Sequence, residues 1–154
     1  MKDTDSIYTA AVVGLGRIGL GYDLNSKPSE IFSHTKAYLN HPSFRLIGGV
    51  DIEPEKRKEF ETYSQTHAFE TVEGLFESRG NLIDCISICT PTPVHRETIK
   101  GVLGRPLRII LLEKPLSNCF HDAQQILDVV EKPVQLAVNY IRRWDPAILE
   151  IKNV

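Results

Sequence analysis

The chain contains 154 residues, of which 42% are hydrophobic and 25% are charged, and its formal net charge is −2. Such a composition is typical of one globular domain, and it excludes an intrinsically disordered chain and a strongly basic nucleic-acid-binding protein. The sequence has no apolar run long enough to span a membrane, and no apolar stretch near its start that would mark a secretory signal. We therefore expect a cytoplasmic protein whose partners include neither a membrane nor a nucleic acid.

The cysteines also fit a cytoplasmic protein. Cys85, Cys89 and Cys119 form an odd set without a CxxC pair, unlike a disulfide framework or a zinc site. Cys85 and Cys89 lie in an apolar run and are expected to be buried, inert thiols. No metal site is predicted.

Short apolar runs and helical stretches alternate along the chain. The apolar runs predict six strands, at Tyr8–Gly14, Phe44–Asp51, near 68–69, Leu82–Thr90, Arg108–Glu113 and Val134–Tyr140. Helices are expected from near Ser33 through Leu39, from Pro54 to about Ser64, from about Val94 to Leu103, and from a cap at Ser117 or Asn118 to a point before Pro133. The last of these has an apolar repeat of Phe120, Ala123, Leu127 and Val130. The alternation predicts an α/β fold, a doubly wound, mostly parallel six-stranded sheet in the order 3-2-1-4-5-6, with helices on both faces.

A glycine-rich turn follows the first predicted strand. Residues 14–19, Gly-Leu-Gly-Arg-Ile-Gly, match the GxGxxG pattern of dinucleotide-binding turns. The first glycine allows a tight turn, the second leaves room for a pyrophosphate, and the third lets a helix pack close to the sheet. The turn's backbone N–H groups would then meet the anion. The candidate cofactor residues here are Gly14, Gly16, Arg17, Ile18 and Gly19; a plain strand-to-helix turn is the alternative.

Asp51 ends the second predicted strand. A carboxylate there can accept hydrogen bonds from an adenosine ribose and would repel a 2′-phosphate, which favours NAD over NADP as the cofactor. A cap for the helix after Pro54 is an alternative role that is compatible with the first. Gly19 and Asp51 are 32 positions apart, against a usual spacing of about 20. We place the excess in an insertion over Gly21–Ser33, which would weaken the helix dipole's contribution to phosphate binding.

Three further motifs follow the later strands. They are Thr90-Pro91-Thr92-Pro93-Val94-His95, Glu113-Lys114-Pro115, and Asn139-Tyr140-Ile141-Arg142-Arg143-Trp144-Asp145-Pro146. With the glycine turn and Asp51, they make nearly the whole chain similar to the N-terminal domain of the glucose-fructose oxidoreductase and inositol dehydrogenase family (Gfo/Idh/MocA). The resemblance implies a Rossmann-type NAD(P)-binding domain of a two-domain oxidoreductase. Such enzymes transfer a hydride between a nicotinamide cofactor and a sugar, inositol or related polyol, often as homo-oligomers.

The resemblance also implies roles for single residues. Lys114 corresponds to the catalytic position, and the residues expected beside the cofactor are Thr90, Pro91, His95 and Glu113. An ammonium at a strand end could hydrogen-bond a substrate hydroxyl and stabilise developing negative charge, or act as a base if its pKa is lowered. A solvated lysine is the alternative for Lys114, as a surface position is for His95. The Lys114–Pro115 bond could be cis.

The remaining residues are the end of the last strand and four histidines. Asn139 and Tyr140 end the last strand and could face the substrate together with Lys114. His34 is expected to match a family histidine that the insertion displaces. His41, His67 and His121 show no pattern and are interpreted as surface residues.

The domain prediction follows from the resemblance. Residues 1–144 are expected to form the dinucleotide-binding domain, and residues 145–154 the start of a truncated linker helix toward a C-terminal substrate domain. By itself the chain would bind a dinucleotide without turning over substrate. The competing hypothesis is a free-standing module that senses a dinucleotide or binds another nucleotide, without catalysis.

Overall fold

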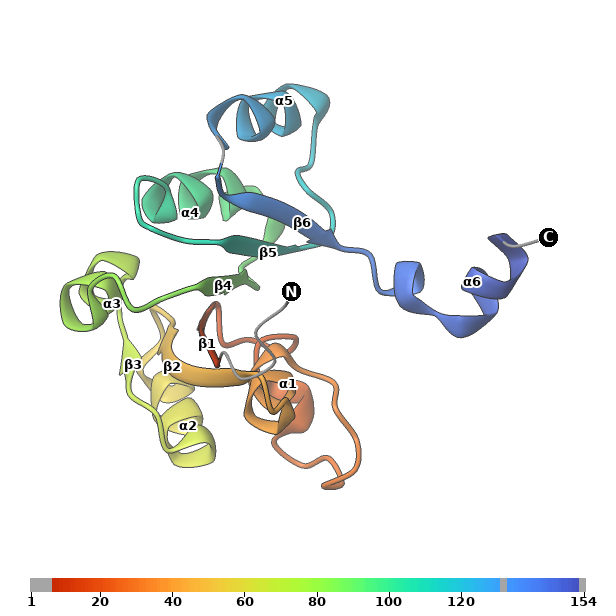
Figure 1. The fold of residues 1–154 in the computed structure, drawn as a ribbon. Coiled ribbons are helices and arrows are strands. Elements are labelled where there is room, and N and C mark those ends of the chain that lie inside the picture. Colours follow the sequence, from red (N-terminus) through yellow and green to blue (C-terminus); the bar gives the residue numbers. More distant parts are fainter. Residues whose placement is uncertain (1–6, 131–132, 153–154) are drawn as a thin grey trace.

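The structure is a computed structural model that describes residues 7–130 and 133–152. Figure 1 shows its helices and strands in alternation. In chain order they are β1 (Tyr8–Val13), α1 (His34–Asn40), β2 (Phe44–Val50), α2 (Pro54–Ser64), β3 (Ala68–Phe69), α3 (Val72–Arg79), β4 (Cys85–Ile88), α4 (His95–Val102), β5 (Ile109–Glu113), α5 (Phe120–Val129), β6 (Gln135–Asn139) and α6 (Pro146–Lys152). Short 3₁₀ helices lie at Gly21–Asp23, Thr92–Val94 and Ile141–Trp144.

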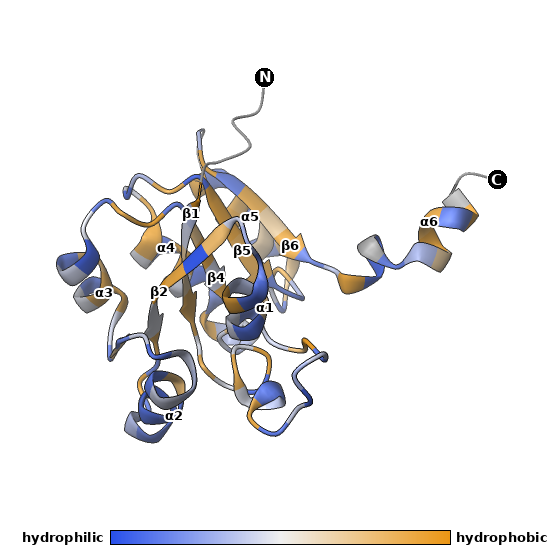
Figure 2. Cartoon of the chain, turned by 60° about the horizontal axis from the view of Figure 1, so that its bottom comes forward, coloured by the Kyte–Doolittle hydropathy of each residue, from blue (hydrophilic) through white to orange (hydrophobic). Residues whose placement is uncertain are grey.

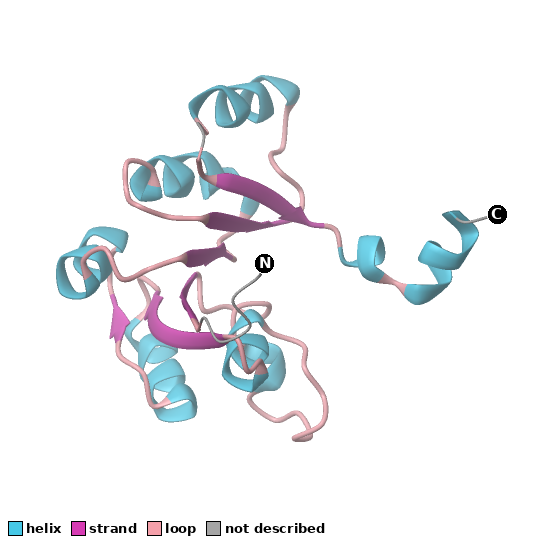
Figure 3. Cartoon of the chain, viewed as in Figure 1, coloured by secondary structure: helices cyan, strands magenta, loops and turns pink. Residues whose placement is uncertain are grey.

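The strands form one parallel sheet in the order β3-β2-β1-β4-β5-β6, which confirms the predicted α/β fold and strand order. Figure 3 shows the strands side by side, with helices on both sides of the sheet. Helix α6 begins at Pro146, as the Asp-Pro pair predicts, and in Figure 1 it stands apart from the sheet. No helix of the described residues has both the length and the apolar character to cross a bilayer.

Two apolar cores lie on opposite faces of the sheet. Alternate residues of β1 divide between them, because successive strand side chains point to opposite faces. Ala11 and Val13 join the core under α3, α4 and α5, whereas Ala10 and Val12 join the core under α1 and α2. Burial on both faces explains why the strands are continuous apolar runs in the sequence, and Figure 2 shows them largely in orange.

Helix α3 was not predicted. Its start is capped by Thr71, whose side chain accepts a hydrogen bond from the Gly74 N–H at 3.0 Å. Its end is followed by Gly80, which has a positive φ of 58°. Leu75 and Phe76 bury its inner side. The helix has eight residues, so its apolar positions are too few to show a helical period, and its two caps are the signal that could have identified it.

Two details predicted for α5 are wrong. Its N-cap residue is Cys119, not Ser117 or Asn118, and it makes no capping hydrogen bond through its side chain. The predicted apolar face is not the buried one either, because Phe120 and Leu127 are 83% and 54% exposed while Ile126 is fully buried.

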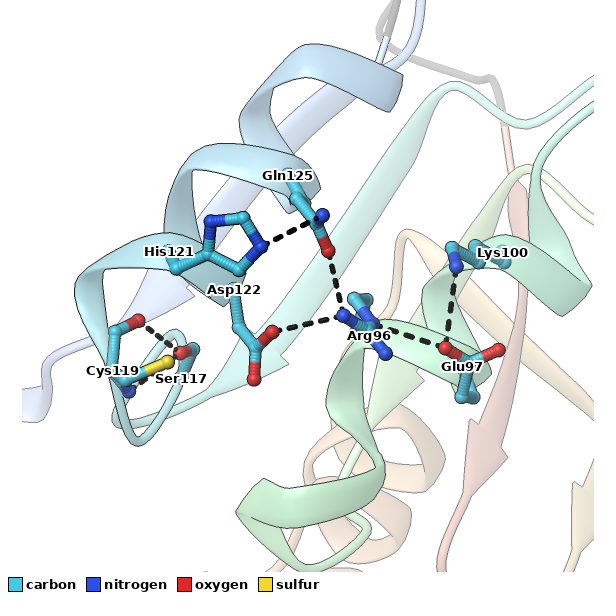
Figure 4. A network of polar contacts seen from close by, with 8 residues as sticks. All are labelled: Arg96, Glu97, Lys100, Ser117, Cys119, His121, Asp122 and Gln125. Atoms are coloured by element: carbon cyan, nitrogen blue, oxygen red, sulfur yellow. Dashed lines mark hydrogen bonds and ion pairs between the residues drawn. The ribbon is translucent and has the colours of Figure 1, made fainter.

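A polar network between α4 and α5 lies on the same face of α5 as the buried Ile126. Arg96 Nη1 donates to Asp122 Oδ1 at 2.9 Å and to Gln125 Oε1 at 2.6 Å, as Figure 4 shows. Asp122, Gln125 and Ile126 are spaced at three and four residues, so they share one helix face. Because that face packs toward α4, Phe120 and Leu127 are turned to the outside.

The insertion between the glycine turn and the first helix is present. Residues after Gly19 form the 3₁₀ helix and a loop, and α1 starts at His34, close to the predicted start near Ser33, which is its N-cap. The first amides of α1 are hydrogen-bonded to the glycine turn: His34 N–H donates to the Ile18 carbonyl at 3.1 Å, and Thr35 N–H donates to the Gly19 carbonyl at 3.0 Å. The start of α1 is therefore attached to the turn although thirteen inserted residues (21–33) separate them in sequence.

Candidate functional site

The predicted site residues follow strands that end at one edge of the sheet. The parallel register pairs Val13 of β1 with both Val50 and Ile88, and it pairs Glu113 with Asn139. The residues that come next therefore meet at the carboxyl edge, where ligands bind in open parallel sheets. They include Gly14, Asp51, Cys89, Lys114 and Tyr140.

A cavity of about 730 Å³ lies at this edge. The glycine turn, the start of α2, the connection from β3 to α3, and the segment after β4 form its walls. Of the predicted cofactor residues, those that line it are Gly14, Gly16, Arg17, Ile18, Asp51, Thr90 and Pro91. Those that lie outside its lining are Gly19, His95 and Glu113, and the same holds for Lys114, Asn139 and Tyr140.

The glycines of the turn serve two different purposes. Gly14 has φ +89°, and an added Cβ would lie 2.7 Å from the carbonyl carbon of Cys89 and from the amide nitrogen of Thr90. A Cβ at Gly19 would overlap the Gly14 carbonyl oxygen, so both positions need glycine for the turn itself. At Gly16 an added Cβ would meet nothing within 4 Å. The open space beside Gly16 belongs to the cavity and suits a ligand that approaches the backbone closely.

Four consecutive backbone N–H groups of the turn, those of residues 16–19, make no hydrogen bond within the described parts of the chain. The N–H groups of the two preceding residues are hydrogen-bonded: Gly14 N–H donates to the Val50 carbonyl at 2.8 Å, and Leu15 N–H donates to Asp51 Oδ2 at 2.7 Å. Successive free amides make an anion-binding concavity. Because the amides that begin α1 are used by the turn's carbonyls, a phosphate would be bound by these four N–H groups and not by α1.

Asp51 connects the turn to the start of α2. Its Oδ2 accepts from Leu15, and its Oδ1 accepts from the Glu53 N–H at 2.9 Å. Asp51 is not the predicted cap of this helix, because the N-cap of α2 is Glu53, whose own N–H is the group that Asp51 accepts from. Each carboxylate oxygen has room for a second donor, so the ribose role stays a prediction.

The cavity is acidic around Asp51. Glu53 and Glu70 line the same part, and the neighbouring Lys56 pairs its ammonium with the Glu53 carboxylate. The hydrogen bond that Lys56 donates to Glu53 is the main cause that raises the pKa of Lys56. Three carboxylates, those of Asp51, Glu53 and Glu70, thus line the cavity together with two cations, Lys56 and Arg17.

Glu113 lies in a buried hydrogen-bond network next to the cavity. Its Oε1 is 2.9 Å from Nε2 of His34, and Asn139 Nδ2 donates to the same oxygen at 2.6 Å. His34 Nδ1 is 2.9 Å from Ser87 Oγ, which in turn is 2.8 Å from the hydroxyl of Tyr38. Four elements, α1, β4, β5 and β6, therefore contribute side chains to this network.

The direction of these hydrogen bonds follows from the ionised carboxylate. Burial raises the pKa of Glu113, but hydrogen bonds from His34 and Asn139 outweigh it and hold the pKa below its usual range. A carboxylate only accepts, so His34 donates from Nε2. Burial raises the pKa of Tyr38 to about 12, so its hydroxyl stays protonated at neutral pH.

Lys114 follows this network and is exposed. Its backbone N–H donates to Glu113 Oε2 at 3.3 Å, and its bond to Pro115 is cis, the isomer that the sequence allowed. Among the described residues its ammonium takes part in no ion pair. Tyr140 is 53% exposed, whereas the Asn139 amide is used by Glu113.

His95 is not a surface residue, so that alternative is wrong. Its side chain is 1% exposed, with Nε2 2.9 Å from the Thr90 carbonyl and Nδ1 3.4 Å from the Leu116 carbonyl. The first turn of α4 packs between the ends of β4 and β5, which encloses the ring. His95 thus joins the segment after β4, which lines the cavity, to the segment that follows Lys114.

Residues of this region that received no role from the sequence include Tyr22, Tyr38 and Ser87. Tyr22 lines the cavity from the insertion. Ser87 is fully buried between Ile86 and Ile88, and a lone serine inside an apolar strand is the signal that could have marked it. As predicted, Cys85 and Cys89 are buried. His41, His67 and His121 are exposed.

Comparisons with known proteins agree with this geometry. The family model GFO_IDH_MocA, described as "Oxidoreductase family, NAD-binding Rossmann fold", matches residues 8–140. The uncharacterized oxidoreductase YrbE of Bacillus subtilis is 27% identical over 146 residues, which are 93% of this chain and 38% of that protein. The inositol 2-dehydrogenase of Rhizobium meliloti is 26% identical over 145 residues, 92% of this chain and 38% of that enzyme.

A solved structure gives the same fold. The oxidoreductase from Agrobacterium radiobacter, crystallised with NAD+, L-tartaric acid and magnesium, matches 97% of this chain and 40% of its own. The TM-score is 0.79 and the sequence identity 18%. The present chain spans about two fifths of the length of the curated relatives it matches.

Proposed function

The chain belongs to the Gfo/Idh/MocA oxidoreductase family and is its NAD(P)-binding Rossmann domain, and from this premise we propose that it serves a dehydrogenase of sugars, inositols or related polyols. One observation carries the proposal: four unpaired amides and the open space beside Gly16 meet in a cavity at the carboxyl edge of the sheet. That arrangement fits the pyrophosphate of a dinucleotide.

The chain's own residues divide the binding task. The amides of residues 16–19 hold the pyrophosphate, Asp51 accepts from the ribose hydroxyls, and Thr90 and Pro91 flank the nicotinamide. When bound, the nicotinamide ring accepts or donates the hydride. Lys114, next to the cavity, hydrogen-bonds the substrate oxygen and exchanges its proton.

NAD is the proposed cofactor, in preference to NADP. A 2′-phosphate would bring about two negative charges to the part of the cavity that already holds Asp51, Glu53 and Glu70. Of the two cations that line the cavity, Lys56 is paired with Glu53, and Arg17 lies in the glycine turn, where the pyrophosphate is proposed to bind. The electrostatic cost of the additional phosphate therefore has little compensation.

Residues 145–154 are proposed to lead into a substrate domain. The curated relatives are longer than this chain, which covers 38% of each, and an inositol 2-dehydrogenase is among them. The remainder of the enzyme would complete a substrate site that begins with Lys114, Asn139 and Tyr140. The whole enzyme is proposed to act as a homo-oligomer, and the present chain to bind the dinucleotide without turnover.

Calorimetric titration of the chain with NAD+ and NADP+ tests the proposal. We expect binding of both, tighter for NAD+, and no detectable heat at millimolar cofactor would contradict it. Asp51→Asn keeps one acceptor oxygen but removes the charge, so it should lower the preference for NAD+. Glu55→Gln, the same change of charge at an exposed position on α2 outside the cavity, is the matched control and should leave the preference unchanged.

A further inference from the structure

The insertion over Gly21–Ser33 is organised around one buried carboxylate. Asp23 is 2% exposed and accepts three hydrogen bonds: from Ser26 Oγ at 2.7 Å, from the Phe32 N–H at 2.9 Å, and from the Ser33 N–H at 2.7 Å. The bonds to residues 32 and 33 join the end of the insertion to its beginning. The inserted segment is therefore a closed loop with a defined conformation.

A buried lysine completes this arrangement. The Lys36 side chain is 8% exposed, and its Nζ donates to Ser26 Oγ and to the Lys27 carbonyl, both at 2.7 Å. The ammonium also lies 3.7 Å from Asp23 Oδ1. We call Asp23, Ser26 and Lys36 the Asp23 cluster. Because Lys36 belongs to α1, the cluster fixes the loop to a helix of the domain.

The residue next to Asp23 faces the cofactor cavity. Tyr22 lies in the 3₁₀ helix Gly21–Asp23, and its N–H donates to the Arg17 carbonyl at 2.9 Å. Its side chain lines the cavity with Arg17 and Ile18 and is 53% exposed. The ring is thus held at the end of the turn whose amides are free, and about half of its surface is available to a ligand.

We propose that the insertion is a preformed wall of the dinucleotide cavity, in which the Tyr22 ring packs against the bound cofactor and the Asp23 cluster holds the ring in place. The proposal rests on the proposed function, because it assigns a further contact within the same site. An aromatic ring with an apolar face can cover the cofactor beside the pyrophosphate, where the amides supply polar contacts. Since the loop is ordered before binding, little conformational entropy is lost when the cofactor binds.

A second aromatic residue of the insertion provides a matched control. Phe32 is 52% exposed, almost the same as Tyr22, but does not line the cavity. A general effect of the loop's apolar surface would involve both rings equally. A cofactor contact would involve Tyr22 alone.

Calorimetry with NAD+ on the chain and three single variants separates these cases. Covering half of an aromatic ring predicts that Tyr22→Ala weakens the Kd about tenfold, equivalent to about 1.4 kcal/mol. Tyr22→Phe should bind like the unchanged chain, because the ring is the contacting group. Phe32→Ala should also bind like it.

The role of the Asp23 cluster needs a different variant. Lys36→Met keeps the side chain's length but removes the ammonium, so the Phe32 and Ser33 amides should exchange hydrogen for deuterium faster. Amides of β1 and β4 should keep their protection, which shows that the sheet is intact. The Kd for NAD+ should weaken, and the double variant Tyr22→Ala/Lys36→Met should bind no more weakly than the weaker single variant.

Several results would overturn the inference. An unchanged Kd in Tyr22→Ala, or an equal loss of affinity in Phe32→Ala, would refute the specific contact between Tyr22 and the cofactor. If Lys36→Met speeds hydrogen exchange at residues 32 and 33 without changing the Kd, the positioning role of the Asp23 cluster is refuted. If the unchanged chain fails to bind NAD+, the proposed function fails and this inference with it. Binding by the unchanged chain with an unaffected Tyr22→Ala variant refutes the inference alone.

Discussion

Two glycine-to-alanine substitutions separate the ligand-binding role of the glycine turn from its structural role. At Gly16 the new methyl group would enter open space that belongs to the cavity. At Gly14 it would meet the backbone of residues 89 and 90 at 2.7 Å, at a φ of +89°. Gly16→Ala should therefore impair binding and spare the fold, whereas Gly14→Ala should impair the fold.

The magnitudes follow from the two environments. At Gly14, a left-handed φ costs about 1–3 kcal/mol for alanine, and forcing a methyl group against packed backbone adds roughly 1–3 kcal/mol. For a chain of this size each kcal/mol lowers the Tm by about 2–4 °C, so the loss is on the order of 10 °C. At Gly16 the stability should stay level or rise by up to about 1 kcal/mol. A methyl group that displaces one phosphate oxygen from its amide loses about 1.5–3 kcal/mol, roughly 10- to 150-fold in Kd.

Thermal unfolding and calorimetric titration with NAD+ measure the two effects. Gly101→Ala is the control for Gly16→Ala, because its methyl would meet no atom closer than 3.9 Å and lies outside the cavity. Its Kd should equal that of the unchanged chain. Gly16→Ala with an unaltered Kd would refute the placement of the phosphates at this turn. Gly14→Ala with an unaltered Tm would refute the structural reading of that glycine.

Two further predictions concern hydrogen-bonded polar groups. Burial raises the pKa of Asp84, but hydrogen bonds from Thr9 and Arg108 lower it by more, so the net shift is downward from 3.8. A carboxyl whose pKa is lowered in the folded state adds stability above its unfolded pKa, and this stability is lost as the pH falls through its folded pKa. In urea unfolding, the Asp84→Asn variant should therefore lose less stability than the unchanged chain as the pH falls below about 4. An equal loss of stability in the two proteins would contradict the pKa shift. His34→Ala removes a donor from buried Glu113 and should lower the free energy of unfolding by about 1–3 kcal/mol, so an unchanged urea midpoint would show that the network adds nothing to stability.

The sheet could be predicted because its signals are local. Each strand is a short apolar run, and the glycine turn marks the end of β1 within six residues, 14–19. Helix α5 shows where local signals fail. Phe120 and Leu127 have a helical spacing, but the buried residue is Ile126, on the face that also holds the contacts of Asp122 and Gln125 with Arg96. Which face packs depends on the surface of α4, which the sequence of α5 does not contain.

The Glu113 network could be predicted only in part. The resemblance singles out Glu113 and His34 separately, but the two are 79 positions apart, and their contact depends on how α1 lies across β4 and β5. Ser87 and Tyr38 enter the network for the same reason. Such a contact leaves no periodic pattern in the sequence, because the partners belong to different helices and strands.

The insertion shows how a long loop can be accommodated without moving the residues at its ends. Its first residues place Tyr22 at the cavity wall, and its last residue is the N-cap of α1. The first residue of α1, His34, is hydrogen-bonded to Glu113. A loop whose ends could separate would move the cofactor wall and the Glu113 network independently. The bond from the Ser33 N–H to Asp23 at 2.7 Å opposes that separation, together with the bonds from the first α1 amides to the glycine turn. A change that weakens the Asp23 cluster should therefore disturb the cavity and Glu113 together, although the two are built from different strands.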